Sequence, residues 1–382
     1  GCSMRRSSQS GAGSMGSSEL AAGFDSVVGG PRIGFLYGMQ IDRPRGGGTI
    51  HGYQLARHLS ALGAQLSSWY FDAGETQLVH GYRGRELLRF VREIDCLYLR
   101  IEWSNVSSTL SWLKALRLGA LPVIWELNGT PAELQFSESA SAIAGMVSRL
   151  RRNARACDAA IGVSEEVVDF ARTDLRIDNV HCIPNGSDPD LFMPRGEPRS
   201  GPLKCAWIGT SQAGWHDLGL LYELAAALVR AGSDVEFHLF GNPKGLPADP
   251  PRNVVIRGEF HYEDLPRELA RCDVGIHFFR KSDPPVVGSP LKLFDYMACG
   301  MPVIVNARGQ QARIIEEYGC GWFAEPSVDA MVRQLMAIAE APEHVTDRGR
   351  RARAAVLSRY NWRANAEETL AVVRSLLRSR RS

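Results

Sequence analysis

Short apolar runs recur along the whole chain, and stretches in which apolar residues have helical spacing separate several of them. In the first half the runs lie at 33–37, 66–71, 96–100, 121–127, 159–163 and 180–183. In the second half they lie at 203–209, 235–240, 254–256, 274–279 and 303–305. Strands that alternate with helices form parallel sheets with helices on both faces. The pattern therefore predicts an α/β fold with doubly wound parallel sheets.

The length of 382 residues is too great for one ordinary domain, and about two are expected. A segment rich in proline and charge, 194–202, separates the two series of runs and has the composition of a linker. We therefore predict Rossmann-like domains at 32–196 and 197–360. Residues 1–31 are rich in Ser, Gly and Ala, lack the apolar stretch of a secretory signal, and are predicted to be disordered.

The composition excludes several classes of protein. Hydrophobic residues make up 45% of the chain, which is enough for a sizeable core, and a net charge of +2 argues against a dedicated nucleic-acid binder. No apolar run approaches the roughly 20 residues that span a bilayer. The 8 cysteines are scattered without a C-x-x-C pair, so neither a zinc site nor a disulfide framework is expected. These features predict a cytoplasmic protein.

The stretch 288–305 has the pattern of a loop, a short helix and a buried strand. Ser289 is a good N-cap, and the proline after it suits the first helical position. The backbone amides of Leu291 and Lys292 would then point out of the helix N-terminus, where they could bind an anion such as phosphate. Asp295 lies more than one turn into the helix, away from its apolar stripe. It is either a solvated surface charge or a ligand contact.

A glycine-rich loop that ends at Gly46–Gly48 follows the first predicted strand, and a helix is predicted after it from about Thr49 to Leu62. Strand, glycine loop and helix together bring backbone N–H groups close to phosphate or to sugar hydroxyls. The loop lacks the G-x-G-x-x-G spacing of dinucleotide-binding proteins, and a flexible turn is the alternative. The residues expected on the inner side of the helix are Ile50, Tyr53, Leu59 and Leu62.

The stretch 288–305 resembles the nucleotide-sugar loop of retaining GT-B glycosyltransferases, the large bacterial "glycosyl transferases group 1" type that includes mannosyl- and glucosyltransferases. Their pattern is Glu, seven residues, Glu, a helix end of small residues and a Gly-x-Pro-Val strand. Asp295 stands at the second acidic position, and Ala298–Val303 matches the helix end and the strand of the pattern. Val287 stands at the first acidic position and departs from the pattern. The segment Ile183–Phe192 also resembles the family's I-P-N-G-V-D motif.

The resemblance covers roughly residues 33 to 375, in the same order. It implies a GT-B fold, in which two Rossmann-like domains with parallel sheets face each other across a cleft. It also implies that the segment 361–382 forms a helix that crosses back to the first domain. The implied reaction moves a sugar from a nucleoside-diphosphate donor, UDP- or GDP-linked, to an acceptor hydroxyl with retention of configuration. Such an enzyme needs no further cofactor and no metal ion.

The resemblance also implies roles for particular residues. The backbone of Gly47 and Gly48 would approach the diphosphate, and Asn128, at the end of a predicted strand, would orient the sugar in place of the family's His. The loop after the run 254–256 would cradle the base of the nucleotide. The residues assigned to the donor site are Gly47, Gly48, Gly209, Gly258, Phe260, Ser289, Leu291 and Asp295. The residues assigned to catalysis are Asn128, Lys292 and Arg280.

The loop Thr210–His216 lacks the Arg and Lys that many relatives place there to neutralise the diphosphate. Arg280 and Lys281, which follow the run 274–279, and Lys292 are the cations proposed to replace them, although each could equally be a solvated surface charge. His216 is a weaker substitute, because a histidine with its ordinary pKa of about 6.5 is mostly neutral at pH 7. The amide of Asn128 can hydrogen-bond a sugar hydroxyl, and a structural turn is its alternative role.

The predicted partners are a nucleotide-sugar donor and a sugar, lipid-linked or small-molecule acceptor, and no nucleic acid. The tail Arg374–Arg381 carries four arginines, which form either a solvated helix end or a weak peripheral contact with anionic lipid at the inner membrane face. Two alternatives stay open. One is a GT-B nucleotide-sugar epimerase, and the other is a non-catalytic protein that binds a nucleotide sugar or a partner.

Overall fold

Two parallel sheets organise the protein. The computed structural model describes residues 29–37, 47–70, 90–101, 121–196, 201–210, 214–242 and 249–380. Within these ranges twelve strands form two sheets of six, and every recorded pairing is parallel. The α/β class predicted from the alternating runs is therefore confirmed. The segment predicted to be disordered lies almost wholly outside the described residues, as does Gly46.

The first sheet has the strand order β2-β1-β3-β4-β5-β6. Its strands are β1 (Arg32–Tyr37), β2 (Gln65–Tyr70), β3 (Cys96–Arg100), β4 (Val123–Leu127), β5 (Ala159–Gly162) and β6 (Val180–Cys182). The helices of this half are α1 (Gly47–Ala61), η1 (Pro131–Phe136, a 3-10 helix), α5 (Ala140–Asn153), η2 (Ala154–Ala156, a 3-10 helix) and α6 (Glu165–Thr173). The sequence pattern did not predict α5, because Leu150 is the one residue of that helix that is fully buried.

The second sheet has the order β12-β11-β10-β7-β8-β9. Its strands are β7 (Lys204–Thr210), β8 (Glu236–Asn242), β9 (Val254–Gly258), β10 (Val274–His277), β11 (Val303–Val305) and β12 (Gly321–Phe323). The helices after the linker are α7 (Leu218–Arg230), α8 (Leu265–Leu269), α9 (Leu291–Ala298), α10 (Gln310–Tyr318), α11 (Val328–Glu340), α12 (Pro342–Ser358) and α13 (Trp362–Ser379). The predicted strand ends agree with the observed ones within two residues.

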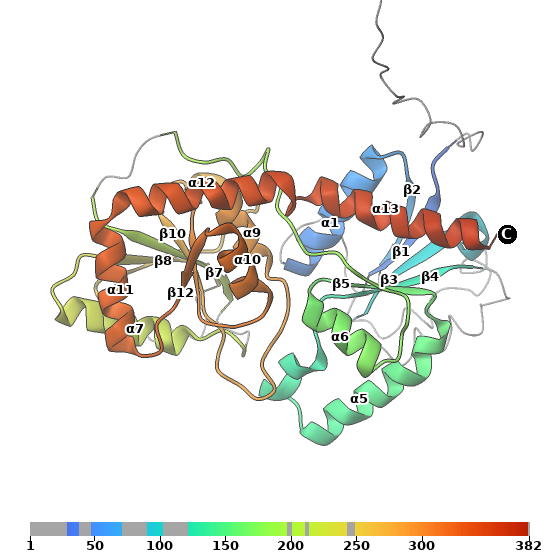
Figure 1. The fold of residues 1–382 in the computed structure, drawn as a ribbon, viewed down its shortest axis with the longest axis horizontal. Helices are drawn as coiled ribbons and strands as arrows, with labels where there is room; N and C mark the ends of the chain where they lie inside the picture. The colour runs from blue at the N-terminus through green and yellow to red at the C-terminus, as the bar shows by residue number, and fades with distance from the viewer. Residues whose placement is uncertain are drawn as a thin grey trace, which may run out of the picture.

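Burial on both faces explains why apolar runs located the strands so well. All five residues of β4 are buried. Ile124 belongs to a core cluster with residues of α1 and α13, whereas Trp125 and Leu127 belong to a cluster with residues of α5 and α6. Alternate side chains of a strand point to opposite faces, so both faces of this sheet are covered by helices. Figure 1 shows α1 and α13 on one side of this sheet and α5 and α6 on the other.

The last helix returns to the first half of the chain. α12 lies along the second half, and α13 continues beyond it over the first sheet (Figure 1). Ala366, Leu370 and Val373 of α13 are buried in the same cluster as Leu55 and Leu59 of α1. The hydrophobic core of the first half therefore contains residues from both ends of the chain. The boundaries at residues 31, 196 and 360 remain predictions.

Two details of the predicted helices were wrong. α9 begins at Leu291 with Pro290 at the N-cap position, and the Ser289 side chain does not cap it. Instead Ser289 Oγ accepts a hydrogen bond from the backbone N–H of Asn185. In α1, Tyr53 is 38% exposed, whereas His51 and Leu55 are buried. Since successive residues turn by about 100° in a helix, Tyr53 lies on the opposite side from the row of His51 and Leu55.

We expect Leu370→Ala to destabilise the protein by roughly 2–5 kcal/mol, because it opens a space in the core that α13 shares with α1. Leu370 is 2% exposed. Urea unfolding followed by circular dichroism measures the loss.

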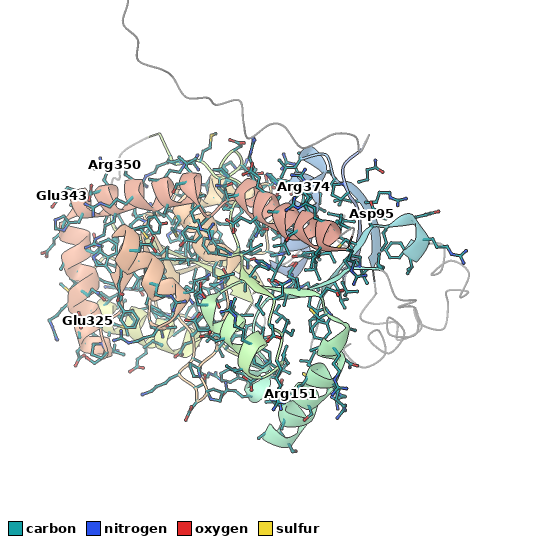
Figure 2. All side chains as sticks on the ribbon, turned by 45° about the vertical axis from the view of Figure 1, so that its right-hand side comes forward. Asp95, Arg151, Glu325, Glu343, Arg350 and Arg374 are labelled. Carbon is teal, nitrogen blue, oxygen red and sulfur yellow. The ribbon has the colours of Figure 1, made fainter. Side chains whose placement is uncertain are left out.

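Arg374→Ala is the matched control on the same helix. Its side chain is exposed, as Figure 2 shows, and its removal should change stability by no more than about 0.5 kcal/mol. Equal stability of Leu370→Ala and Arg374→Ala would contradict the packing of α13 against the first half.

Candidate functional site

The N-termini of one helix from each half lie close together. α1 begins at Gly47, and α9 begins at Leu291. A Cβ atom built on Gly47 would lie 4.0 Å from Leu291 Cδ1. The first hydrogen bond of α9 runs from the Leu293 amide to the Pro290 carbonyl, at 3.1 Å, so the two preceding amides lie outside the helical ladder. Two helix N-termini with such amides form a favourable environment for an anion.

Lys292 stands beside this point, within a group of aromatic and histidine side chains. Its ammonium lies 3.0 Å from His216 Nε2 and 5.1 Å from the centre of the Trp207 ring. Burial lowers the pKa of Lys292 to about 7. Gly209 borders the same group, because a Cβ atom there would lie 3.0 Å from His216 Cε1 and closer still to the Trp207 ring. A side chain at position 209 would therefore displace the partners of Lys292.

His277 lies beneath this group and was not singled out from the sequence. It ends β10, is 1% exposed, and its ring centre lies 5.8 Å from that of His216. Burial, followed by the charges of Lys292 and His216, holds the pKa of His277 well below its usual value. Within the described ranges, neither nitrogen of this ring has a hydrogen-bond partner. His277 is therefore a neutral, buried imidazole below the Lys292 ammonium.

The remaining assigned residues lie along the line where the two halves meet. Asn128 follows β4, and the next residue, Gly129, forms an antiparallel bridge with Gly288, just before α9. The Arg280 guanidinium lies 5.6 Å from the centre of the Phe136 ring of η1. Arg280 is thus a contact between the halves, and its proposed role at a diphosphate remains a prediction.

Two residues of the assigned donor site lie at the end of β9 and in the loop after it. Phe260 is half-buried and packs on the same core cluster as Ile50 of α1. Gly258 has a φ of +77°, a conformation that favours glycine, and a Cβ atom there would meet no neighbour within 4 Å. The structure therefore brings Phe260 close to the interface between the halves. Among the described residues, no contact links Gly258 to the group around Lys292.

Asp295 is not a solvated surface charge. It is 4% exposed, and its Oδ1 accepts a hydrogen bond of 2.6 Å from Ser187 Oγ in the segment Ile183–Phe192. Burial raises the pKa of Asp295 to about 7; the Ser187 hydrogen bond opposes this shift and the neighbouring Asp188 adds to it. The interpretation of Asp295 as a solvated surface charge, left open by the sequence, is therefore wrong. A contact of Asp295 with a ligand remains a prediction.

A buried polar network links the two halves and was also missed from the sequence. Glu126, which is 0% exposed, has Oε1 3.0 Å from His51 Nε2. His51 Nδ1 lies 2.7 Å from Asn185 Oδ1, and Asn185 Nδ2 donates to the Ser289 carbonyl at 2.5 Å. The only sequence signal for this network was the position of Glu126 near the carboxyl end of a strand. Its partners come from far along the chain.

Metal-binding clusters and membrane spans were also sought in the described residues. No group of three or more His, Cys, Asp or Glu side chains there is arranged to hold a metal ion. No helix in those ranges is both long and apolar enough to cross a membrane.

Comparisons with solved structures identify the fold. Sucrose-phosphate synthase from Thermosynechococcus elongatus superimposes with a TM-score of 0.68 at 16% identity, over 91% of this chain and 100% of that one. Anabaena HepE, in complex with UDP and glucose, has a TM-score of 0.66 at 16% identity, over 90% and 100%. A glycosyltransferase from Rickettsia africae has a TM-score of 0.66 at 13% identity, over 91% and 99%. The fold is GT-B.

Sequence comparison covers less of this GT-B chain. A family described as "Glycosyl transferase-like" matches residues 221–371, which include α9 and Lys292. This part of the chain therefore carries a glycosyl transferase-like sequence. A search of curated proteins finds no significant match.

We expect Asp295→Asn to change how stability depends on pH. The folded state holds the Asp295 proton up to about pH 7, whereas the carboxyl of the unfolded chain, with its usual pKa of 3.8, loses it near pH 4. The stability that this proton provides is therefore lost as pH rises from about 4 to about 7. The asparagine variant lacks this loss, so its stability relative to the wild type should rise across that window. Denaturant unfolding at several pH values measures the difference.

Asp190→Asn is the control, because Asp190 is exposed in the segment Ile183–Phe192, which also holds Ser187. It should follow the wild-type pH dependence. Parallel curves for Asp295→Asn and the wild type would contradict a protonated Asp295 in the folded state.

Proposed function

We propose that this protein is a glycosyltransferase that moves a sugar from a nucleoside-diphosphate donor to an acceptor hydroxyl. The observation that carries the proposal is the pair of neighbouring helix N-termini, at Gly47 and Leu291, beside the Lys292 side chain. The glycosyl transferase-like match over residues 221–371 supports it. So does the similarity of fold to HepE, whose structure contains UDP and glucose.

In this proposal the diphosphate lies between the two helix N-termini. The amides of Gly47 and Gly48 approach it from α1, and those of Leu291 and Lys292 approach it from α9. Lys292 supplies the positive charge that relatives obtain from an Arg and a Lys. Binding of a dianion favours the charged form of Lys292, so the buried amine gains a proton when the donor enters.

Catalysis would rest on positioning and on stabilising the charge of the departing diphosphate. The two acids near the site, Glu126 and Asp295, are buried and hold hydrogen bonds or ion pairs with protein groups. Neither is placed as the nucleophile of a double displacement. As the resemblance implies, we propose a hexosyl transfer with retention of configuration that uses neither acid as a nucleophile and needs no metal ion.

A nucleotide-sugar binder without transferase activity is the second candidate. Val287, which stands where relatives have an acid, is half-buried and packs against the core cluster of the first half. This position is therefore used to join the halves and offers no hydrogen bond to a sugar. Release of free nucleoside diphosphate only when an acceptor is added would identify a transferase. Release without an acceptor would favour an epimerase-like or hydrolytic enzyme, and binding without release would favour the non-catalytic protein.

The basic tail bears on the class of acceptor. A lipid-linked acceptor would agree with weak peripheral contact of the tail Arg374–Arg381 with anionic lipid. Arg380 already pairs with Asp158 at 2.9 Å, while Arg374 and Arg378 are exposed. Sugar and small-molecule acceptors need no such contact, so sedimentation with anionic vesicles distinguishes the classes.

We expect Lys292→Met to weaken binding of UDP or GDP by about 10- to 100-fold, because it removes a charge-assisted hydrogen bond to the diphosphate. Since burial lowers the pKa of Lys292 to about 7, wild-type protein should take up a proton on binding above pH 7. Its affinity should therefore fall as pH rises from 7 to 9. Titration calorimetry in buffers of different ionisation enthalpy measures both the affinity and the proton uptake.

Lys281→Met is the matched comparison, because Lys281, the other lysine proposed from the sequence, is exposed and in this proposal is a solvated surface charge. It should bind the nucleotide like the wild type and show the same proton uptake. If neither UDP nor GDP binds to the wild type, the proposed function is wrong. If both lysine variants bind alike, Lys292 does not contact the diphosphate.

A further inference from the structure

Few apolar side chains join a core cluster of the opposite half. Two core clusters belong to the first half and α13, and two belong to the second half and the end of the segment Ile183–Phe192. Among the other described residues, Ile50 of α1 packs on a cluster of the second half, and Val287 packs on a cluster of the first. An interface without a large apolar core allows two domains to move relative to each other. Polar contacts therefore decide how firmly the halves are joined.

Two stretches of chain connect the halves, and they lie side by side. One includes the segment Ile183–Phe192, and the other runs from α12 into α13. Ser187 pairs with Asn361 in a parallel bridge, and the Ser187 N–H donates to the Tyr360 carbonyl at 3.0 Å. Because the two connections are adjacent, the halves can turn about them as about a hinge. Further contacts are needed to hold the halves in one arrangement.

One such contact joins the start of α6, in the first half, to the start of α10, in the second. Arg313 donates two hydrogen bonds to Glu166, of 2.6 Å to Oε1 and 3.0 Å to Oε2. Gln310 Nε2 donates to the Val163 carbonyl at 2.7 Å. These four residues form what we call the α6–α10 clasp. Gly309 allows the close approach of the two helices, since a Cβ atom there would lie 2.9 Å from Glu166 Oε1.

The direction of the Arg313 side chain is informative, because other carboxylates are closer in sequence. Glu316 and Glu317 stand three and four residues later on α10, at the spacing of ordinary helical ion pairs. Arg313 instead reaches Glu166, 147 residues away, with the two-bond geometry that makes an Arg–carboxylate contact strong. Although burial works against it, hydrogen bonding by Arg313 holds the pKa of Glu166 below its usual value. The pair across the interface thus prevails over pairs within the helix.

We propose that the α6–α10 clasp is a salt-sensitive latch that holds the two halves together in the ligand-free protein. The side chains of Arg313 and Glu166 are 47% and 26% exposed, so dissolved ions can reach and screen the pair. Once the pair is broken, Arg313 can turn to Glu317 on its own helix, and the halves separate by turning about the two connections. Separation widens the candidate site, because α1 and α9 belong to different halves. The inference goes beyond the proposed function and does not rest on it.

Small-angle X-ray scattering of the full, ligand-free chain at about 50 mM and about 500 mM NaCl tests the latch. The wild type should have the smaller radius of gyration at low salt, where the ion pair is intact. Arg313→Gln should shift the equilibrium toward the open form by about 2- to 5-fold and abolish the salt dependence. Arg313→Glu sets two carboxylates against each other and should be expanded even at low salt. The exchanged variant, Glu166→Arg with Arg313→Glu, restores an ion pair and should recover most of the wild-type compactness.

Arg333→Glu is the matched control, because Arg333 is exposed on α11 and its replacement makes the same change of net charge. It should scatter like the wild type at both salt concentrations, and equal expansion of this control would overturn the inference. So would an Arg313→Glu protein as compact as the wild type, or an exchanged variant as expanded as Arg313→Glu. Circular dichroism of each variant distinguishes separation of the halves from unfolding. No nucleotide takes part, so failure of UDP and GDP to bind would defeat the proposed function alone.

Discussion

The carboxyl ends of all strands in a parallel sheet lie on the same side of the sheet, and this constraint determines where the candidate site lies. Asn128 follows the end of β4, and His277 ends β10. Helices that connect parallel strands run in the opposite direction, so α1 begins at the same edge at which the strands of the first sheet end. Segments that follow strands of the first half contact segments of the second half there, so groups that are more than 150 residues apart in sequence come together. The bridge between Gly129 and Gly288 marks the meeting point.

The sequence predicted the sheets well and the network between them poorly. Apolar runs such as that of β4 locate strands because burial is a local property of such runs. His51 and Glu126 are polar, and nothing near either residue in sequence indicates its partner. Ser289 had the local pattern of an N-cap, but its hydroxyl accepts from the amide of Asn185, 104 residues away. Contacts of this range are decided by the tertiary fold and override a local capping preference.

Several positions near the site join the two halves, and one of them is a departure from the resembled family. Val287 supplies apolar contact to the first half in place of an acid. Asp295, which keeps the family's acidic position, accepts a hydrogen bond from Ser187 and so helps to join the segment Ile183–Phe192 to α9. Arg313 pairs with Glu166 at 2.6 and 3.0 Å across the same interface. The chain thus uses several positions near the site for contacts between its halves, which limits the number of side chains that can bind a ligand directly.

The return of α13 affects the order in which the chain can fold during synthesis. The strands of the second half are complete once Phe323 has been added, and its helices once Ser358 has. The first half is made earlier, yet its core lacks Ala366, Leu370 and Val373 until those residues have left the ribosome. The half that is translated first is therefore the last to complete its hydrophobic core. Until then the apolar face formed by α1 and the first sheet stays exposed, and a chaperone has a defined interval in which to protect it.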